Sequence, residues 1–133
     1  MPVEGLITFT SPHLPQETLA RLKAGIVARP LSIFAEIDHS AGAQAVGLAL
    51  RPLVLLIFGA AKGGTPFMQA AATAGIDLPL KLLVWQDMTG ATQVSYNDPG
   101  WVARRHGLGD QVAGPLDAMS ALLRALVMTA VAE

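Results

Sequence analysis

Short apolar segments alternate with turn residues and amphipathic stretches along nearly the whole chain. Apolar residues that alternate or run continuously over about four to eight positions predict strands, and apolar residues at helical spacing predict helices. The pattern predicts strands at residues 5–10, 31–38, 53–58, 80–86 and 91–96. It predicts helices at residues 15–29, 40–50, 66–75, 101–106 and 115–130.

The order of these elements predicts an α/β (α+β) fold. We expect a two-layer sandwich with a mixed, mostly antiparallel sheet of about five strands and with the helices packed on one face. A doubly wound parallel sheet is less favoured, because a hairpin over residues 80–96, turning at Gly90, leaves few parallel units. The length of 133 residues predicts a single domain over residues 1–133.

The second face of the sheet is expected to be apolar. In the strand 31–38 the two-residue side-chain period places Ile33, Ala35 and Ile37 on one face. The opposite face then carries Phe34, Glu36, Lys81, Leu83 and Trp85. Apolar residues make up 52% of the chain and charged residues only 14%, against about 25% charged in an average domain. This balance predicts that a homodimer covers the second face.

Two helices are predicted in some detail. In the segment 40–50, Ala41, Ala45 and Leu48 form the predicted buried side, and the small alanines allow close approach to the sheet. The next helix is predicted to begin with Thr65 as N-cap and Pro66 at the first helical position. Strand 53–58 is apolar at every position, which is typical of a strand covered on both faces.

Charge and cysteine content exclude several classes of protein. The net charge is -1 and there is no basic stripe, so nucleic acid is not an expected partner. Without cysteine there is no disulfide framework and no thiolate nucleophile. We expect a cytoplasmic protein, because acidic Glu4 precedes no long apolar run. The longest run, residues 53–58, is far shorter than the roughly 20 residues of a membrane helix, so no membrane association is expected.

The glycine-rich stretch 59–66 is the first candidate site. It joins a buried strand to a helix N-terminus, where free N–H groups and the helix dipole favour an anion, and Lys62 adds a positive charge. Lys62 precedes Gly63, Gly64 and Thr65, so the spacing matches no nucleotide-binding loop. The alternative is a flexible connection with an ordinary Thr-Pro cap.

Further polar residues stand at strand ends. Asp38 and His39 end one strand, and Asp38 there either caps the next helix or takes part in acid–base chemistry with His39. Tyr96 and Asp98 end the second hairpin strand, where they either form a turn or converge with His39 in a polar pocket. Lys81 is a candidate general base on an apolar strand, or it pairs with an acid such as Glu36.

Neither a metal site nor a cofactor is expected. His13, His39 and His106 lack ligand spacing, and no thiolates accompany them. The five methionines are interpreted as core filler rather than as haem ligands.

Taken together, these motifs resemble the family called domain of unknown function 302. The resemblance is carried by Asp38-His39, by residues 58–66 with Met68, by residues 76–81 and by Tyr96-Asn97-Asp98-Pro99. It implies a small two-layer α/β domain with a mostly antiparallel sheet, found in bacteria and archaea and commonly dimeric, with no established activity. Family members often have Gly-Asn-Pro where this chain has Gly59-Ala60-Ala61.

Three functional hypotheses follow. The leading one is a cytoplasmic homodimer that binds a small anionic ligand at the rim of strand ends. Its predicted ligand-binding residues are His39, Lys62, Gly63, Gly64, Thr65, Tyr96 and Asp98. The second hypothesis is an acid–base enzyme that uses Asp38, His39 or Lys81. The third is a purely structural module that serves to dimerise.

Overall fold

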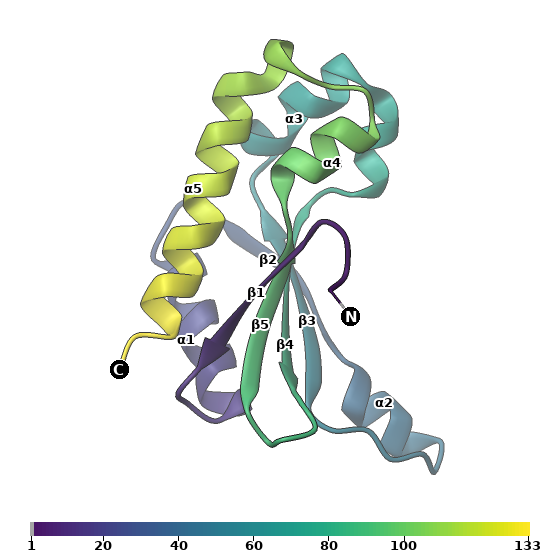
Figure 1. Ribbon diagram of the computed structural model, residues 1–133, viewed down its shortest axis with the longest axis vertical. Coiled ribbons are helices and arrows are strands. Elements are labelled where there is room, and N and C mark those ends of the chain that lie inside the picture. Colours follow the sequence, from purple (N-terminus) through teal and green to yellow (C-terminus); the bar gives the residue numbers. More distant parts are fainter. Residues whose placement is uncertain (1) are drawn as a thin grey trace.

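The computed structural model describes residues 2–133, and its centre is one antiparallel sheet in the order β1-β5-β4-β3-β2 (Figure 1). The strands are β1 (Leu6–Ser11), β2 (Ser32–Asp38), β3 (Leu53–Gly59), β4 (Leu80–Gln86) and β5 (Thr92–Asn97). Each neighbouring pair is antiparallel, with Leu6 opposite Asn97 and Leu53 opposite Trp85. The predicted five-stranded, mostly antiparallel sheet is therefore confirmed.

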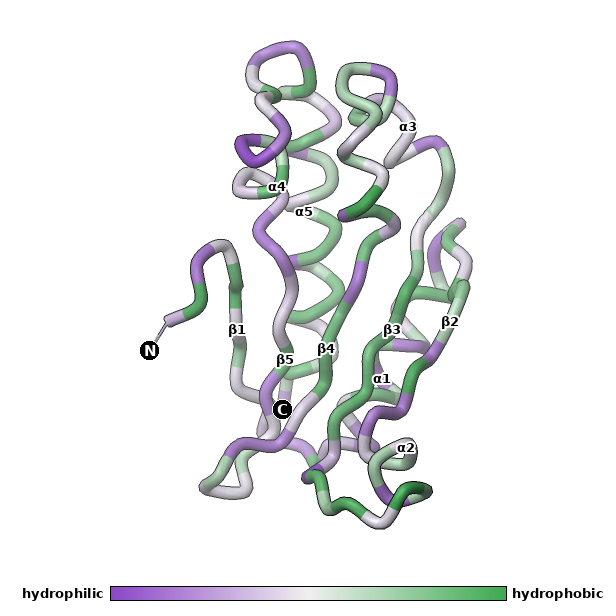
Figure 2. The backbone as a smooth tube through the Cα atoms, turned by 90° about the vertical axis from the view of Figure 1, so that its right-hand side faces the viewer, coloured by the Kyte–Doolittle hydropathy of each residue, from purple (hydrophilic) through white to green (hydrophobic). Residues whose placement is uncertain are grey.

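The helices occupy one face and the two ends of this sheet. They are α1 (Pro15–Val27), α2 (His39–Ala45), α3 (Ala61–Ala70), α4 (Pro99–Arg105) and α5 (Ala113–Ala130), with short 3₁₀ helices η1 (Ala72–Ile76) and η2 (Asp110–Val112). Figure 1 shows α1 and α5 side by side on one face, with α3 and α4 above the upper end and α2 beyond the lower end. Within residues 2–133, no helix lies across the other face of the sheet (Figure 2).

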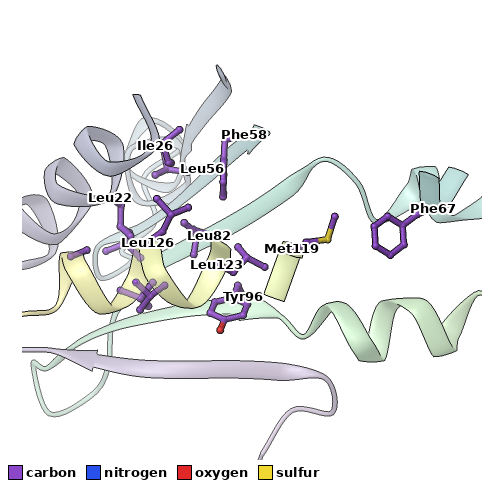
Figure 3. Packing of buried hydrophobic residues seen from close by; sticks show 14 of the residues in the cluster. Leu22, Ile26, Leu56, Phe58, Phe67, Leu82, Tyr96, Met119, Leu123 and Leu126 are labelled. Atoms are coloured by element: carbon purple, nitrogen blue, oxygen red, sulfur yellow. The ribbon is translucent and has the colours of Figure 1, made fainter. Parts of the chain in front are cut away.

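The core lies between the sheet and the pair α1 and α5 (Figure 3). Leu22 and Ile26 recur at the spacing of one helical turn along α1 and are fully buried. They pack with Leu56, Phe58, Leu82, Val84, Val94, Leu123, Leu126 and Val127. This burial of apolar surface is the main force that holds the helical layer on the sheet.

The longest helix contributes directly to this core. The segment Asp110–Ala130 is long and apolar enough, by length and composition alone, to cross a membrane. In the structure Met119, Leu123 and Leu126 turn one side of α5 into the core, and Asp117 and Arg124 lie on its exposed side. That arrangement is typical of the core helix of a soluble-like α/β fold.

A β-bulge at Phe34 corrects the predicted faces of β2. Ile33 pairs with Phe58 on the helical side, but the register shifts before Ala35, which pairs with Ile57 on the open side. One extra residue exchanges the faces of everything that follows it. Glu36 therefore lies on the helical side, where its Oε1 is 2.7 Å from Lys23 Nζ of α1. The predicted pairing of Glu36 with Lys81 is wrong.

The structure of the segment 40–50 also differs from its prediction. Helix α2 ends at Ala45, and Gly47 follows with a φ of 78°. No residue of α2 is buried, so the prediction that its alanines and Leu48 pack on the sheet is wrong. Val46, Leu48 and Leu50 instead face solvent. The prediction that β3 is covered on both faces fails for the same reason, because Leu55 and Ile57 remain half-buried on the open face.

Helix α3 begins at Ala61, five residues before the predicted first helical position, Pro66. Thr65 lies inside the helix, and its hydroxyl donates to the carbonyl of Ala61 at 2.6 Å instead of capping. Pro66 is also inside α3. The glycine-rich stretch is thus the first part of a helix and not a loop in front of one.

Candidate functional site

A cavity of about 490 Å³ lies at the upper end of the sheet, between β2, α3, the segment before β4 and the first half of α5. Its volume falls in the range of about 300–1,000 Å³ that is usual for small-molecule sites. Its walls are largely apolar, and the larger side chains that line it include Phe34, Met68, Leu78, Leu80, Met119 and Leu122. Such a lining favours an apolar guest over a strongly hydrated one.

Gly59 allows the backbone to turn from β3 into this cavity. Its φ is 150°, a conformation that residues with a side chain rarely adopt. A Cβ atom built there lies 3.7 Å from Pro79 Cβ and 4.0 Å from Phe34 Cε2, both ordinary contacts. The backbone conformation, rather than lack of space, therefore calls for glycine at the point where β3 ends.

The first turn of α3 forms the most polar part of the cavity wall. Ala60 precedes the helix and offers no side-chain cap, so the first N–H groups of α3 depend on other partners. Lys62 lies in this turn and is exposed. The positive end of the helix dipole and the ammonium group thus act on the same side of an otherwise apolar cavity.

Three of the seven predicted ligand-binding residues come together here. Lys62, Gly63 and Gly64 all line the cavity. Thr65 is the next residue in α3, but its hydroxyl is bonded to a carbonyl of the same helix. The glycine-rich stretch therefore forms part of the cavity wall, and its role in binding a ligand stays a prediction.

The other three lie elsewhere. His39 begins α2, next to the Asp38–Val54 end of the sheet, whereas the cavity adjoins Gly59 at the opposite end of β3 (Figure 1). Tyr96 points into the core, where it stacks with Phe9 at 6.2 Å between ring centroids and where burial raises its pKa. Asp98 caps α4 by accepting from the N–H of Gly100 at 3.0 Å. The expected convergence of Tyr96 and Asp98 with His39 is wrong.

The residues of the alternative acid–base site are also kept apart. The carboxylate of Asp38 accepts from Ser40 Oγ at 2.6 Å and from the N–H of Ala41 at 2.9 Å, which lowers its pKa. Asp38 is thus the cap of α2. Lys81 pairs in register with Ile57 near the other end of the sheet, and its Nζ donates to the carbonyl of Asp77 at 3.4 Å.

The sequence prediction missed a polar cluster between η1 and α4. His106 Nε2 donates to Asp77 Oδ2 at 2.6 Å, and the hydroxyl of Thr73 lies 2.9 Å from His106 Nδ1. Arg105 Nη1 donates to both carboxylate oxygens of Asp77 at 2.9 Å. The imidazole side chain is only 6% exposed. This cluster fastens the chain just before β4 to the C-terminal end of α4.

The electrostatics of this cluster favour the ionised carboxylate. Burial raises the pKa of Asp77, but the hydrogen bond from His106 and the charge of Arg105 outweigh that effect and leave the pKa below its usual value. With a carboxylate at Nε2, the neutral imidazole carries its proton on that nitrogen and accepts the Thr73 hydroxyl at Nδ1. Across residues 2–133, no group of three His, Asp or Glu side chains is arranged to hold a metal ion.

Comparison with known proteins gives the family. The family model described as domain of unknown function DUF302 matches residues 7–126, which is most of the chain. The chain belongs to the DUF302 family. An uncharacterized conserved DUF302 protein from Bacillus stearothermophilus has a crystal structure that superposes with a TM-score of 0.84, covering 96% of this chain and 99% of that one. At 18% identity this likeness shows the fold.

Curated relatives of this DUF302 chain carry another name. A protein of Brucella suis called fluoride-specific ion channel FluC 1 is 43% identical over 105 residues, which is 79% of this chain and 41% of that protein. The protein of the same name in Brucella abortus is 43% identical over 105 residues, which is 79% of this chain and 39% of that protein. The DUF302 chain therefore spans about two fifths of the length of these relatives.

Proposed function

We propose that this DUF302 domain binds a small amphipathic anion, with its apolar part in the cavity and its charged group at Lys62 and the first turn of α3. The observation that supports the proposal is the cavity itself, which is large enough for a ligand and is bordered by a cation at one wall. The apolar lining narrows the expected ligand from any small anion to an anion that also has an apolar part. A small, strongly hydrated anion would lose its hydration in the cavity, because the apolar walls offer no hydrogen bonds in return. An anion with an apolar body loses little hydration free energy when that body enters the cavity.

The position of the charged group follows from the walls. Lys62 Nζ is on a flexible side chain, and the first N–H groups of α3 are fixed and have no side-chain cap. An anionic head at this turn gains from both the helix dipole and the ammonium charge. The remainder of the molecule lies between Met68, Met119 and Leu122, whose flexible or branched side chains adapt to differently shaped guests.

The test compares decanoate with its uncharged match decanol by isothermal titration calorimetry and thermal shift. We expect decanoate to bind more tightly and to raise the unfolding midpoint by mass action. Lys62→Glu is expected to weaken decanoate about tenfold and to leave decanol nearly unchanged. No binding of either compound, or equal effects of Lys62→Glu on both, contradicts the proposal.

A matched pair of substitutions on α5 locates the ligand. Ala118 lines the cavity, while Ala125 is exposed about two turns further along the same helix and away from it. Ala118→Trp is expected to fill the cavity and abolish binding of both compounds, and Ala125→Trp is expected to change nothing. Because both positions are exposed, neither indole has to enter the core. Equal losses in both variants would place the ligand elsewhere.

The Brucella relatives support a second proposal, that the domain acts as an accessory to a membrane channel. Proteins named as fluoride-specific ion channels contain a segment 43% identical to most of this chain. We propose that the domain acts from the cytoplasmic side, with its α/β core outside the membrane. The test is fluoride efflux from liposomes that contain the Brucella suis channel with and without its matching segment. A changed efflux supports the accessory role, and unchanged efflux contradicts it.

A further inference from the structure

A second, smaller cavity adjoins the candidate ligand cavity. Its volume is about 30 Å³, against about 490 Å³ for the ligand cavity, and it lies between α3, α4, α5 and the start of β4. One water molecule needs roughly 10–15 Å³, so the smaller cavity has room for about two groups of that size. Its walls are largely apolar and include Phe67, Val102 and Leu123. Such walls offer a water molecule few hydrogen bonds, so the space suits hydrocarbon better than water.

The side chains of Leu78, Leu80 and Met119 line both cavities and form the partition between them. Leu80 is fixed in β4, and Leu78 directly follows Asp77, whose carboxylate is held by its hydrogen bonds. Met119 reaches the partition from α5 on an unbranched side chain with three rotatable bonds, which adapts more easily than leucine. Figure 3 shows this side chain pointing from α5 toward Phe67, a wall of the smaller cavity. Met119 is therefore the movable part of the partition.

We propose that Met119 determines how long a ligand the site accepts. Rotation of its side chain joins the two cavities and admits the end of an unbranched acyl chain to the smaller one. This inference rests on the proposed binding of an amphipathic anion, and it narrows that ligand to a carboxylate with a linear chain, because an opening one side chain wide is too narrow for a ring. The carboxylate stays at Lys62 and the first turn of α3, which line the larger cavity.

The size of the smaller cavity sets the limit on chain length. Each methylene group that moves from water into an apolar space raises the affinity about fourfold. Affinity therefore rises with chain length until the smaller cavity is full, about two carbon atoms beyond Met119. It then stops rising, because Phe67 and Leu123 at the far wall are buried in the core and leave no further space.

The test measures the affinities of decanoate, dodecanoate and tetradecanoate for the full chain by isothermal titration calorimetry, with each acid below its micelle-forming concentration. The readout is the ratio of the tetradecanoate affinity to the decanoate affinity. Met119→Ala leaves the cavities permanently joined and is expected to raise this ratio at least tenfold. Met119→Ile keeps a side chain of similar size but fixes its first torsion angle, so it is expected to close the partition and lower the ratio about tenfold.

Met68→Ala is the matched control, because it removes the same atoms from a methionine that lines the larger cavity on α3, away from the partition. We expect it to leave the ratio unchanged. If Met119→Ala does not fold, Met119→Ile still decides the question, since it keeps the core filled.

The outcomes separate this inference from the proposed function. A ratio that stays at the wild-type value in the Met119 variants, or that changes equally in Met68→Ala, overturns the role of Met119. If decanoate binding still depends on Lys62 in that case, the proposed function stands. If none of the three acids binds the wild-type chain, both the proposed function and this inference are overturned.

Discussion

The imidazole of His106 and the carboxylate of Asp77 are joined by a hydrogen bond of 2.6 Å across 29 residues of sequence. Asp77 is followed directly by Leu78, Pro79 and Leu80, which form one wall of the cavity. His106 ends α4, so the bond fixes this wall to a helix that is itself anchored in the core through Val102. The cluster therefore maintains the shape of the cavity from outside it.

Asp77→Asn is expected to lower the free energy of unfolding by about 1–2 kcal/mol at pH 7, because it removes a charged acceptor shared by His106 and Arg105. The pKa of Asp77 is lower in the folded chain than its ordinary value of 3.8. Its stabilisation is therefore complete above that value and is lost as pH falls through the folded pKa. Urea unfolding of both proteins from pH 7 to pH 2 measures the difference.

The control for this experiment is Asp117→Asn, since Asp117 is exposed on α5 outside the cluster. We expect that substitution to change stability by less than about 0.5 kcal/mol at every pH. A stability gap between wild type and Asp77→Asn that stayed constant down to pH 2 would mean that the ionised carboxylate is not what stabilises the cluster.

The turn between β4 and β5 has a carboxylate with an even more strongly shifted pKa. Hydrogen bonds from the hydroxyl of Thr89 and the amide of Gln93 lower the pKa of Asp87 to about 2. Gln93→Ala is expected to raise that pKa toward 3.8, because it removes one of the two side-chain donors. Carboxyl chemical shifts followed through an acid titration give the value directly, and an unchanged pKa would contradict the assignment.

The same substitution at two glycines is expected to have opposite effects. Gly90 has a φ of 89° in the β4–β5 turn, so Gly90→Ala is expected to cost about 1 kcal/mol or more. Gly114 lies in the first turn of α5, and a Cβ there meets nothing within 4 Å. Gly114→Ala is expected to stabilise by about 0.4–1 kcal/mol. Thermal unfolding of both variants checks the signs, and the prediction fails if they agree.

On the open face of the sheet, the hydroxyl of Ser95 holds a small hydrogen-bonded group together, and its removal is expected to lower the free energy of unfolding. Ser95 is 1% exposed, and its Oγ lies 2.9 Å from Trp85 Nε1 and 2.7 Å from Thr8 Oγ1. Ser95→Ala is expected to cost about 1–2 kcal/mol, because the indole N–H loses its partner. Thr10→Ala removes the exposed bond to Gln93 from the same strand pair and is expected to cost less than about 0.5 kcal/mol.

Much of the fold could be predicted from the sequence because strand and helix periods are local properties. The hairpin with Gly90, the capping role of Asp38 and the amphipathic α5 all follow from neighbouring residues. The bulge at Phe34 could not be predicted, because it depends on how β2 registers against β3. Its effect was to move Glu36 to the other face of the sheet.

Two helix predictions failed because local preference competed with the rest of the structure. Thr65 and Pro66 are a good helix start, yet α3 begins at Ala61. In the segment 40–50 the alanines indicated a helix that packs on the sheet, but Gly47 ends it early and the chain leaves the sheet. A single sequence does not say which surface an apolar helix contacts.

The candidate site was predictable in part. The glycine-rich stretch indicated the polar wall of the cavity, whereas its apolar walls come from Phe34, Met68 and Met119, which are far apart in sequence. Asp77 and His106 lie in two connecting segments that are 29 residues apart in sequence, and no sequence motif predicts that two such residues come into contact. Only the folded chain brings such residues together.

The pairing of Leu6 with Asn97 has a consequence for biosynthesis. Strand β1 emerges from the ribosome first, but the strand beside which it must lie is completed 91 residues later. Until then the growing chain can form the β2–β3–β4 meander, while β1 has no strand with which to pair. Contacts so distant along the sequence slow folding, so the β1 edge of the sheet is closed only after the other four strands have been made.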